Sequence, residues 1–302
     1  MSQVAVLILN WRQYARTRLC LEGLHALETP PEPRLYLIDN ASDAAALREL
    51  IERFPAVTPI PLADNRGFAG GMNAGIRQAL ADGADYVVLL NNDALITPPT
   101  LRQLLAMFEN HHLKAGIVGP SLRTLPPDER VQAVGLDVNR WSGRVVMRHA
   151  GVSPELLYPY PHQVDAVTGA CMMVSREVLE AVGPLDEDYF FYFEDVDLCL
   201  RARDAGYQVF MVPGAVVYHE GGATIGDSPD GVYYGVRNQL KVIRERGLPV
   251  SLPVRVGRSA FIVGLHLAQI VKERRMDLSA GVRAVARGLT HHRQQRYGPA
   301  SP

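Results

Sequence analysis

The sequence predicts an α/β protein with a mostly parallel central sheet, and two observations carry this prediction. Over the first 120 residues, apolar runs of strand length alternate with segments of helical pattern, and the connections between them are short. Residues 4–9 are apolar without interruption, which is typical of a strand buried on both faces. Sheets of this kind bind ligands beyond the carboxyl ends of their strands, so polar residues at those ends are candidates for a binding site.

The expected elements follow the chain in order. In the first half we expect strands at 4–9, 34–38, 57–62 and 86–90, a helix after the first strand, and further helices at 44–54, 74–81 and 97–110. In the second half we expect strands at 170–174, 208–212 and 215–218, and helices at 176–182 and 194–205. Two more helices are expected to start near residues 253 and 279.

Composition and charge exclude several classes of protein. The 302 residues, 47% of them apolar, suffice for one large domain with a modest appendage. The formal net charge of −1 argues against a nucleic-acid binder. Three distant cysteines without a CxxC pair favour neither a disulfide framework nor a zinc site, so the expected compartment is the cytoplasm. The apolar N-terminus lacks a basic region and a cleavage site, and it is interpreted as a strand rather than a signal peptide.

The C-terminal segment differs in charge from the rest of the chain. Residues 251–302 contain nine Lys or Arg and two acids, about +7, whereas residues 1–250 carry about −8. We therefore expect a catalytic or binding domain at 1–250 and a basic helical extension at 251–302. The longest apolar stretch of the extension, 259–271, is shorter than the roughly 20 residues that span a bilayer. A peripheral membrane contact, a homodimer contact and a solvated basic face on the first domain all stay open.

Residues 65–75, Asn-Arg-Gly-Phe-Ala-Gly-Gly-Met-Asn-Ala-Gly, are the richest local signal. Small residues let the backbone approach a ligand closely, and the helix that follows offers free N–H groups to an anion. The segment is neither a P-loop nor a GxGxxG motif. On glycine content alone, a tight turn without a ligand is the better interpretation.

Two further segments carry groups with useful chemistry. Asp93 follows an apolar strand and can hold a divalent cation against a diphosphate, with His219 as a second ligand. Glu194, Asp195 and Asp197 open a helix, where one carboxylate can act as a general base. Taken alone, a turn at Asp93, a structural histidine, and charges that complement the helix dipole explain these residues equally well.

The order of the motifs along the chain is more specific than any one of them. From about residue 3 to 245 the sequence resembles a family 2 glycosyltransferase of the GT-A fold, in the rhamnosyltransferase-like branch. The resemblance lies in six successive features: Asp39-Asn40, residues 65–75, residues 91–93, Thr168-Gly169-Ala170, residues 194–197 and His219. Residues 65–75 and 193–203 are its most specific parts.

The resemblance implies roles for particular residues. It implies Asp195 as catalytic base, Glu194 and Asp197 as acceptor-binding residues, and Asp93 with His219 as the site of Mg²⁺ or Mn²⁺. Asn91 stands where the family's metal motif has its first acid, which reduces the charge on the ion. It implies donor-binding roles for the following residues: Asn10, Asp39, Asn65, Gly67, Asn73, Asn92 and Arg237.

The expected function is therefore inverting, metal-assisted sugar transfer in polysaccharide synthesis. The expected donor is a nucleotide-diphosphate sugar, first dTDP-rhamnose and then UDP-sugars, and the acceptor is a hydroxyl of a glycan, a lipid-linked glycan or a small molecule. Asn91 favours an alternative, a catalytically inactive sugar-nucleotide binder in a glycan-assembly complex. A nucleotidyltransferase of related fold is weaker, because no Gly-rich loop with a basic residue follows the first strand.

Overall fold

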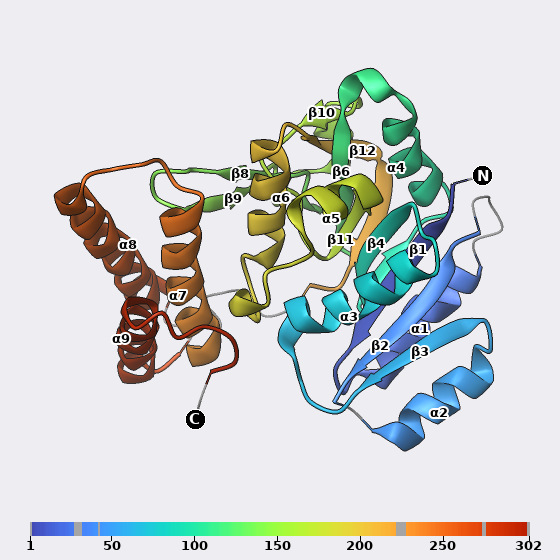
Figure 1. The fold of residues 1–302 in the computed structure, drawn as a ribbon, viewed down its shortest axis with the longest axis horizontal. Helices are drawn as coiled ribbons and strands as arrows, with labels where there is room; N and C mark the ends of the chain where they lie inside the picture. The colour runs from blue at the N-terminus through green and yellow to red at the C-terminus, as the bar shows by residue number, and fades with distance from the viewer. Residues whose placement is uncertain (1, 27–31, 42, 222–227, 274–275, 301–302) are drawn as a thin grey trace.

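A computed structural model of the chain describes residues 2–26, 32–41, 43–221, 228–273 and 276–300 (Figure 1). Its first half is a parallel sheet in which β1 pairs with β2 on one side and with β4 on the other, while β3 extends the sheet beyond β2. The register sets Asn10 beside Asp39, and Leu9 beside Asn91. The polar ends of these strands therefore meet at one edge of the sheet. The strands are β1 (Val4–Asn10), β2 (Arg34–Asn40), β3 (Val57–Leu62) and β4 (Tyr86–Asn91).

The chain after residue 93 extends this sheet on the β4 side. In the described part of the chain the sheet has ten strands, with the main order β10-β12-β6-β11-β4-β1-β2-β3. β11 runs antiparallel to both neighbours, β4 and β6, while β6 and β12 are parallel to each other. The strands added are β5 (Ala94–Ile96), β6 (Ala115–Arg123), β7 (Val131–Ala133), β10 (His162–Gln163), β11 (Cys171–Ser175) and β12 (Gln208–His219). A separate hairpin pairs β8 (Leu136–Val138) with β9 (Val145–Met147).

Helices cover both faces of the sheet. Alternate residues of the central strands enter two different core clusters, as the two-residue period of a buried strand requires. α1 (Tyr14–His25), α2 (Ala44–Arg53) and α4 (Thr100–Glu109) contribute to the cluster on one face. The other face is covered by α3 (Gly67–Ala81), α5 (Arg176–Val182), α6 (Glu194–Asp204) and α7 (Pro229–Glu245).

The predicted extension forms two helices, as expected. α8 (Leu252–Glu273) and α9 (Leu278–Arg293) lie beside α7, on the side away from the sheet (Figure 1). Ile262 and Val285 belong to the same core cluster as residues of the sheet. α8 has 22 residues and therefore extends beyond the apolar stretch at 259–271. By length and composition alone, this helix could cross a membrane. Only 22% of its most apolar window is buried in the protein.

Three expectations about element boundaries were wrong. α3 begins at Gly67, not at residue 74, so most of the glycine-rich segment is helix rather than loop. Residues 94–96 pair with β12 as a short strand, and α4 starts only at Thr100. The two expected strands at 208–218 are one strand, β12, with an irregular pairing between Val212 and Val216, where Pro213-Gly214 interrupts the pattern.

Candidate functional site

Asn10 and Asp39 begin the site at the ends of β1 and β2. Asn10 Nδ2 donates to Asp39 Oδ1 over 2.8 Å, and the Tyr14 hydroxyl donates to Asp39 Oδ2 over 3.1 Å. Asn92, after β4, joins the same group, since its Nδ2 donates to Thr17 Oγ1, which in turn donates to Asn10 Oδ1. The structure therefore connects Asn10, Asp39 and Asn92. Tyr14 and Thr17 lie on α1, and no motif in the sequence marks them.

The glycine-rich segment is fixed to two other parts of the site. Asn40 Nδ2 donates to the exposed Asn65 Oδ1 over 2.9 Å, and the Arg66 amide donates to Asn40 Oδ1. Gly67 has φ +68°, and a Cβ there would lie 2.3 Å from the Phe190 carbonyl oxygen. The Phe68 amide donates to that same oxygen over 2.7 Å. Glycine is required at position 67 both by its backbone conformation and by this close approach.

Asn73 has a structural position rather than the expected contact with a donor. The side chain is buried, its Nδ2 donates to the Leu185 carbonyl and to Glu187, and its Oδ1 accepts from the Leu185 amide. These bonds hold the segment before α6 against α3. The expectation that Asn73 contacts the sugar donor is therefore corrected, because its polar atoms bond Leu185 and Glu187.

Asp93 and His219 meet at the end of β4 and β12. Asp93 Oδ1 lies 3.2 Å from His219 Nε2, and Asn91 Nδ2 lies 3.4 Å from the same nitrogen. Gln132 Nε2 donates to the His219 carbonyl, which orients the amide so that its Oε1 faces His219 Nδ1 at 2.9 Å. Since an amide oxygen only accepts, Nδ1 carries a proton, and the lone pair of a neutral ring is left on Nε2, facing Asp93.

The side chains of Asp93 and His219 suit a divalent cation as ligands. A carboxylate oxygen and an imidazole nitrogen converge, and a polar partner orients the histidine, as in many metal sites. Burial raises the pKa of Asp93, but when His219 is protonated on both ring nitrogens, its hydrogen bond and charge outweigh burial and leave the pKa of Asp93 below its ordinary value. Among the described residues no group of three or more His, Cys, Asp or Glu could hold a metal. The protein would thus supply two ligands, and a bound diphosphate would supply others.

Asp195 stands at the N-terminus of α6, after a run of aromatic residues. Phe190, Tyr192 and Phe193 all have positive φ, 61°, 70° and 74°, a conformation that side chains rarely adopt and that clusters at functional sites. Asp195 Oδ2 accepts from the Gly169 amide over 2.8 Å, and Oδ1 accepts from the Val196 amide over 2.8 Å. The half-buried carboxylate is thereby fixed in one orientation.

Asp195 is connected to the pair of Asp93 and His219 through the backbone. The residue after Gly169, Ala170, accepts from the Asn91 amide over 2.9 Å, and Asn91 is two residues from Asp93. Phe68 also lies against Gly169, where a Cβ would approach its ring to 3.1 Å. The glycine-rich segment, the end of β4 and the start of α6 therefore converge on residues 168–170.

Glu194 and Asp195 differ in the hydrogen bonds that their carboxyl groups make. Burial raises the pKa of Glu194 well above its ordinary value, and the neighbouring Asp195 raises it further. Burial also raises the pKa of Asp195, while hydrogen bonds from Gly169 and Val196 act in the opposite direction. Glu194 is buried, and its Oε2 has no partner among the described residues. Glu194 is thus a buried side chain with a raised pKa beside the oriented side chain of Asp195.

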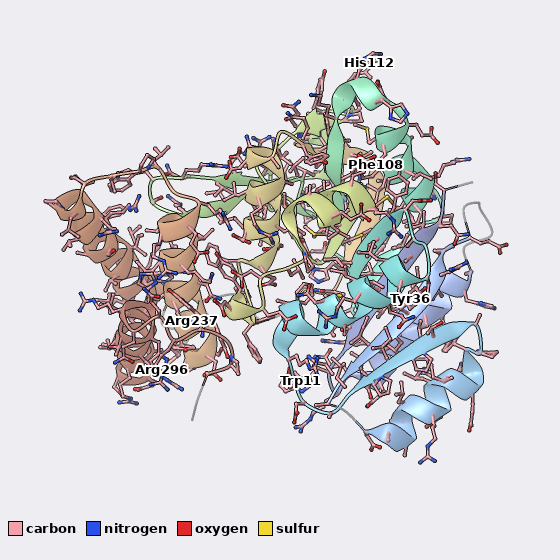
Figure 2. All side chains as sticks on the ribbon, viewed as in Figure 1. Trp11, Tyr36, Phe108, His112, Arg237 and Arg296 are labelled. Carbon is pink, nitrogen blue, oxygen red and sulfur yellow. The ribbon has the colours of Figure 1, made fainter. Side chains whose placement is uncertain are left out.

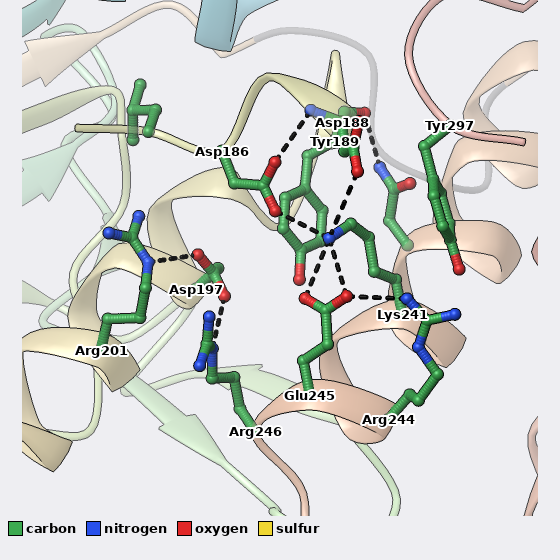
Figure 3. Close-up of polar contacts among 12 residues, drawn as sticks. Asp186, Asp188, Tyr189, Asp197, Arg201, Lys241, Arg244, Glu245, Arg246 and Tyr297 are labelled. Carbon is green, nitrogen blue, oxygen red and sulfur yellow. Dashed lines mark hydrogen bonds and ion pairs between the residues drawn. The ribbon is translucent and has the colours of Figure 1, made fainter. Parts of the chain in front are cut away.

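Asp197 faces the interior rather than a ligand. Its side chain is fully buried, with Oδ2 paired to Arg201 and Oδ1 paired to Arg246 (Figure 3). This placement contradicts the expected contact with an acceptor, because both oxygens are engaged and neither reaches solvent. Asp197 anchors α6 to the end of α7 instead.

Arg237 also has a structural position. It lies on α7 (Figure 2) and is fully buried, and its guanidinium donates to the carbonyls of Asp188, Tyr189 and Gly298. The neighbouring Asn238 donates to three carbonyls of residues 189–192. The expected donor contact of Arg237 is corrected, since protein carbonyls occupy its guanidinium. The two residues hold the aromatic segment that leads into Asp195.

A buried lysine on α7 also holds the aromatic segment. Lys241 Nζ lies 2.7 Å from Asp186 and 2.9 Å from Glu245, over the ring of Tyr189 (Figure 3). Burial lowers the pKa of Lys241, but Asp186 and Glu245 reverse this effect, so the net shift is upward and the cation is retained. The aromatic segment is therefore tied to α7 by charge as well as by hydrogen bonds.

Comparison with known proteins identifies the family. A sequence model described as glycosyltransferase like family 2 matches residues 2–229. The chain belongs to glycosyltransferase family 2. It is a glycosyltransferase, and the relatives that it resembles include rhamnosyltransferases. The dTDP-rhamnosyl transferase RfbF of Shigella flexneri is 27% identical over 251 residues, which cover 78% of this chain and 80% of that one. The N-acetylglucosaminyl-diphospho-decaprenol L-rhamnosyltransferase of Mycobacterium tuberculosis is 29% identical over 225 residues, 68% of this chain and 72% of that one.

Solved structures identify the fold as GT-A. GalNAc-T7 with UDP, GalNAc and Mn²⁺ gives a TM-score of 0.62 at 13% identity, covering 95% of this chain and 55% of that one. The mannosyltransferase PcManGT of Pyrobaculum calidifontis, in complex with GDP-Man and Mn²⁺, gives 0.57 at 16% identity, covering 97% of this chain and 83% of that one. Both the predicted family and the predicted fold are confirmed.

Proposed function

We propose that this glycosyltransferase moves rhamnose from dTDP-rhamnose to a hydroxyl of a glycan or lipid-linked acceptor, with inversion and with Asp195 as general base. One observation carries the proposal: two hydrogen bonds, from Gly169 to the carboxylate of Asp195 and from Asn91 to Ala170, link Asp195 to the end of β4, beside which Asp93 meets His219. The names of the two relatives support rhamnose as the sugar, and the second also supports a lipid-linked acceptor. UDP-sugars are the next donors to test.

The chemistry follows from the position of the carboxylate. The acceptor oxygen attacks the anomeric carbon as the bond from that carbon to the diphosphate oxygen breaks. Asp195 accepts the hydroxyl proton, since each of its oxygens keeps a lone pair beyond the one used by Gly169 or Val196. Attack from the face opposite the leaving diphosphate inverts the configuration without a covalent enzyme intermediate.

The donor side of the proposal uses the residues at the other strand ends. Asp39, which only accepts hydrogen bonds when ionised, suits an N–H of the base or a hydroxyl of the ribose. Asn10 and Asn92 hold that end of the site, while Asn65 and Gly67 place the N-terminus of α3. Asp93 and His219 would hold Mg²⁺ or Mn²⁺, which when bound neutralises the charge that develops on the diphosphate.

A donor panel tests the proposal. The full chain is mixed with dTDP-rhamnose, UDP-glucose, UDP-GlcNAc and GDP-mannose, with Mn²⁺ or with EDTA, and the release of nucleoside diphosphate and the thermal shift are measured. We expect dTDP-rhamnose to give the largest shift and Mn²⁺-dependent release, with the product anomer inverted by NMR. Release from another donor alone would overturn the choice of rhamnose, and a retained anomer would overturn the mechanism.

Asn91 favours a second candidate, a sugar-nucleotide binder without catalysis. It replaces an acid at the cation site with a neutral amide. A donor that stabilises the protein but releases no nucleoside diphosphate, with any acceptor fraction from envelope lipids, would support this candidate. The substitution Asn91→Asp would then be expected to increase Mn²⁺ binding.

The extension supports a proposal about location. Val254, Phe261 and Leu265 are exposed on α8 at helical spacing, beside a segment rich in Lys and Arg. We propose a cytoplasmic protein in which this face contacts an anionic membrane, and contact with a second copy is the alternative. Val254→Ser with Leu265→Ser should reduce sedimentation with anionic vesicles, whereas Leu156→Ser, an exposed residue elsewhere, should not. Equal sedimentation of the two would overturn the membrane contact, and a change in oligomeric state would support the second copy.

A further inference from the structure

Helices α7, α8 and α9 enclose a groove of about 630 Å³, and its lining contains none of the residues proposed for sugar transfer. One part of the wall is apolar and includes Ile243, Val263 and Leu289. The other part is basic. Its cations are Arg244, Arg255, Arg258 and Arg293.

Arg258 is the central observation. Its side chain is only 3% exposed, and it has no ion pair among the described residues. Its two terminal nitrogens reach the carbonyls of Leu248 and Ile243 over long distances, 3.3 and 3.4 Å, and Nε has no partner in the described part of the chain. A buried cation without an anion is costly, so this guanidinium has capacity for an anionic ligand.

The surrounding charges do not compensate Arg258. Among the described lining residues none is acidic. The nearby Glu245 is engaged by Arg244 at 2.8 Å and by Lys241 at 2.9 Å. Burial, followed by the charge of Arg244, lowers the pKa of His292 to about 4, so this lining residue is neutral near pH 7. The lining of the groove therefore combines four arginines with apolar side chains and has no described acidic group.

We propose that this groove binds an amphiphilic phosphate, a ligand with one phosphate group and an apolar chain. Guanidinium groups form paired hydrogen bonds with phosphate oxygens, and three such oxygens can engage Arg258, Arg255 and Arg293 together. The apolar chain lies along Val263, Leu267 and Leu289. The site is distinct from that of sugar transfer, since its lining contains none of the residues proposed for that reaction.

Calorimetry on the full chain with dihexanoyl phosphatidic acid, below its micelle concentration, tests the proposal. We expect binding that weakens at least tenfold in Arg258→Gln and at least threefold in Arg293→Gln. Arg283→Gln removes the same charge from an exposed position of α9 and should change the Kd less than twofold. If Arg258→Gln does not fold, Arg255→Gln with Arg293→Gln replaces it, since both residues are exposed.

Two further ligands test the phosphate group and the apolar chain separately. Inorganic phosphate and dihexanoylglycerol should each bind at least tenfold more weakly than the phosphatidic acid. Equal binding of either one would overturn the combined site, as would an unchanged Kd in the Arg258 and Arg293 variants. Vesicles with phosphatidic acid distinguish the source: sedimentation that Arg258→Gln removes indicates a bilayer lipid, and binding of the short-chain form alone indicates a soluble one.

Discussion

The carboxylate of Asp195 and the backbone amide of Gly169 are joined by a hydrogen bond of 2.8 Å. Gly169 precedes Ala170, whose carbonyl binds the amide of Asn91 at the end of β4. A residue at the start of a helix is thus fixed relative to a strand end that lies about 100 residues earlier in the chain. Each prediction below depends on a contact in or around this arrangement.

Asp195→Asn is expected to lower the rate of transfer by about 10²–10⁴-fold, because an amide cannot take up the acceptor proton. The donor Kd should change little, since the shape of the side chain is kept. Steady-state kinetics and calorimetry with dTDP-rhamnose measure the two effects. Asp204→Asn, an exposed residue at the end of the same helix, is the control and should retain activity. Full activity in Asp195→Asn would rule out Asp195 as the base.

Glu194→Gln is expected to stabilise the protein at pH 8 and to have no effect on stability near pH 4.5. Because folding raises the pKa of Glu194 above its ordinary value of 4.5, the folded chain binds this proton more tightly, and stability is lost as pH rises above that value. Glutamine removes the loss, by about 1.4 kcal/mol for each unit of pKa shift. Thermal unfolding at both pH values measures it, and an equal difference in Tm at the two would contradict it.

Gln132→Leu is expected to raise the Mn²⁺ concentration for half-maximal activity by about 10–100-fold, because the amide fixes the His219 ring and its proton. Asp93→Asn should have a larger effect. Gln163→Leu, in an exposed edge strand, is the matched control. Unchanged Mn²⁺ dependence in Gln132→Leu would show that the orientation of His219 does not matter.

Gly67→Ala is expected to lower Tm much more than Gly83→Ala does. Both glycines have positive φ, +68° and +90°, so alanine is strained by about 1–2 kcal/mol at each. Only at position 67 would the new Cβ also meet the Phe190 carbonyl, at 2.3 Å, whereas nothing lies within 4 Å at position 83. The difference between the variants in denaturant unfolding measures the close approach, and equal losses would contradict it.

Arg237→Met is expected to reduce the free energy of unfolding by several kcal/mol, because it removes the three hydrogen bonds that the buried guanidinium donates to the carbonyls of residues 188, 189 and 298. The folded fraction should bind the donor with little change in Kd. Arg296→Met, at an exposed position, is the control. A lost donor affinity with unchanged stability would restore the expected donor contact of Arg237.

The sequence predicted the first half of the sheet well because its strands are continuous apolar runs. Residues 4–9, 34–38 and 86–90 all lie in strands, and the polar residues after them meet at one edge, as the parallel arrangement requires. The start of α3 could not be predicted from composition, since residues 67–75 contain four glycines, which are poor helix formers that tertiary packing holds in a helix.

Roles that depend on distant contacts could not be predicted from local pattern. Asp197 follows Asp195 by two residues and has the same chemistry, yet it faces Arg201 and Arg246 in the interior. Gln132 is linked to His219 across 87 residues, and no motif surrounds it. The burial of α7 could not be predicted from local sequence pattern either, because the helices that cover it come later in the chain.

The last residues of the chain bear on how the enzyme is prepared. Gly298 bonds both Asp188 and Arg237, and the Ala300 amide donates to the Tyr234 hydroxyl, so the tail is part of the support for the aromatic segment before Asp195. An affinity tag at this end, or a shortened chain that stops near residue 250, would disturb the aromatic segment before α6 although it alters only the C-terminal extension. Gln3, by contrast, bonds Asp85 and Tyr86 at the opposite edge of the sheet. Fusions belong at the amino end.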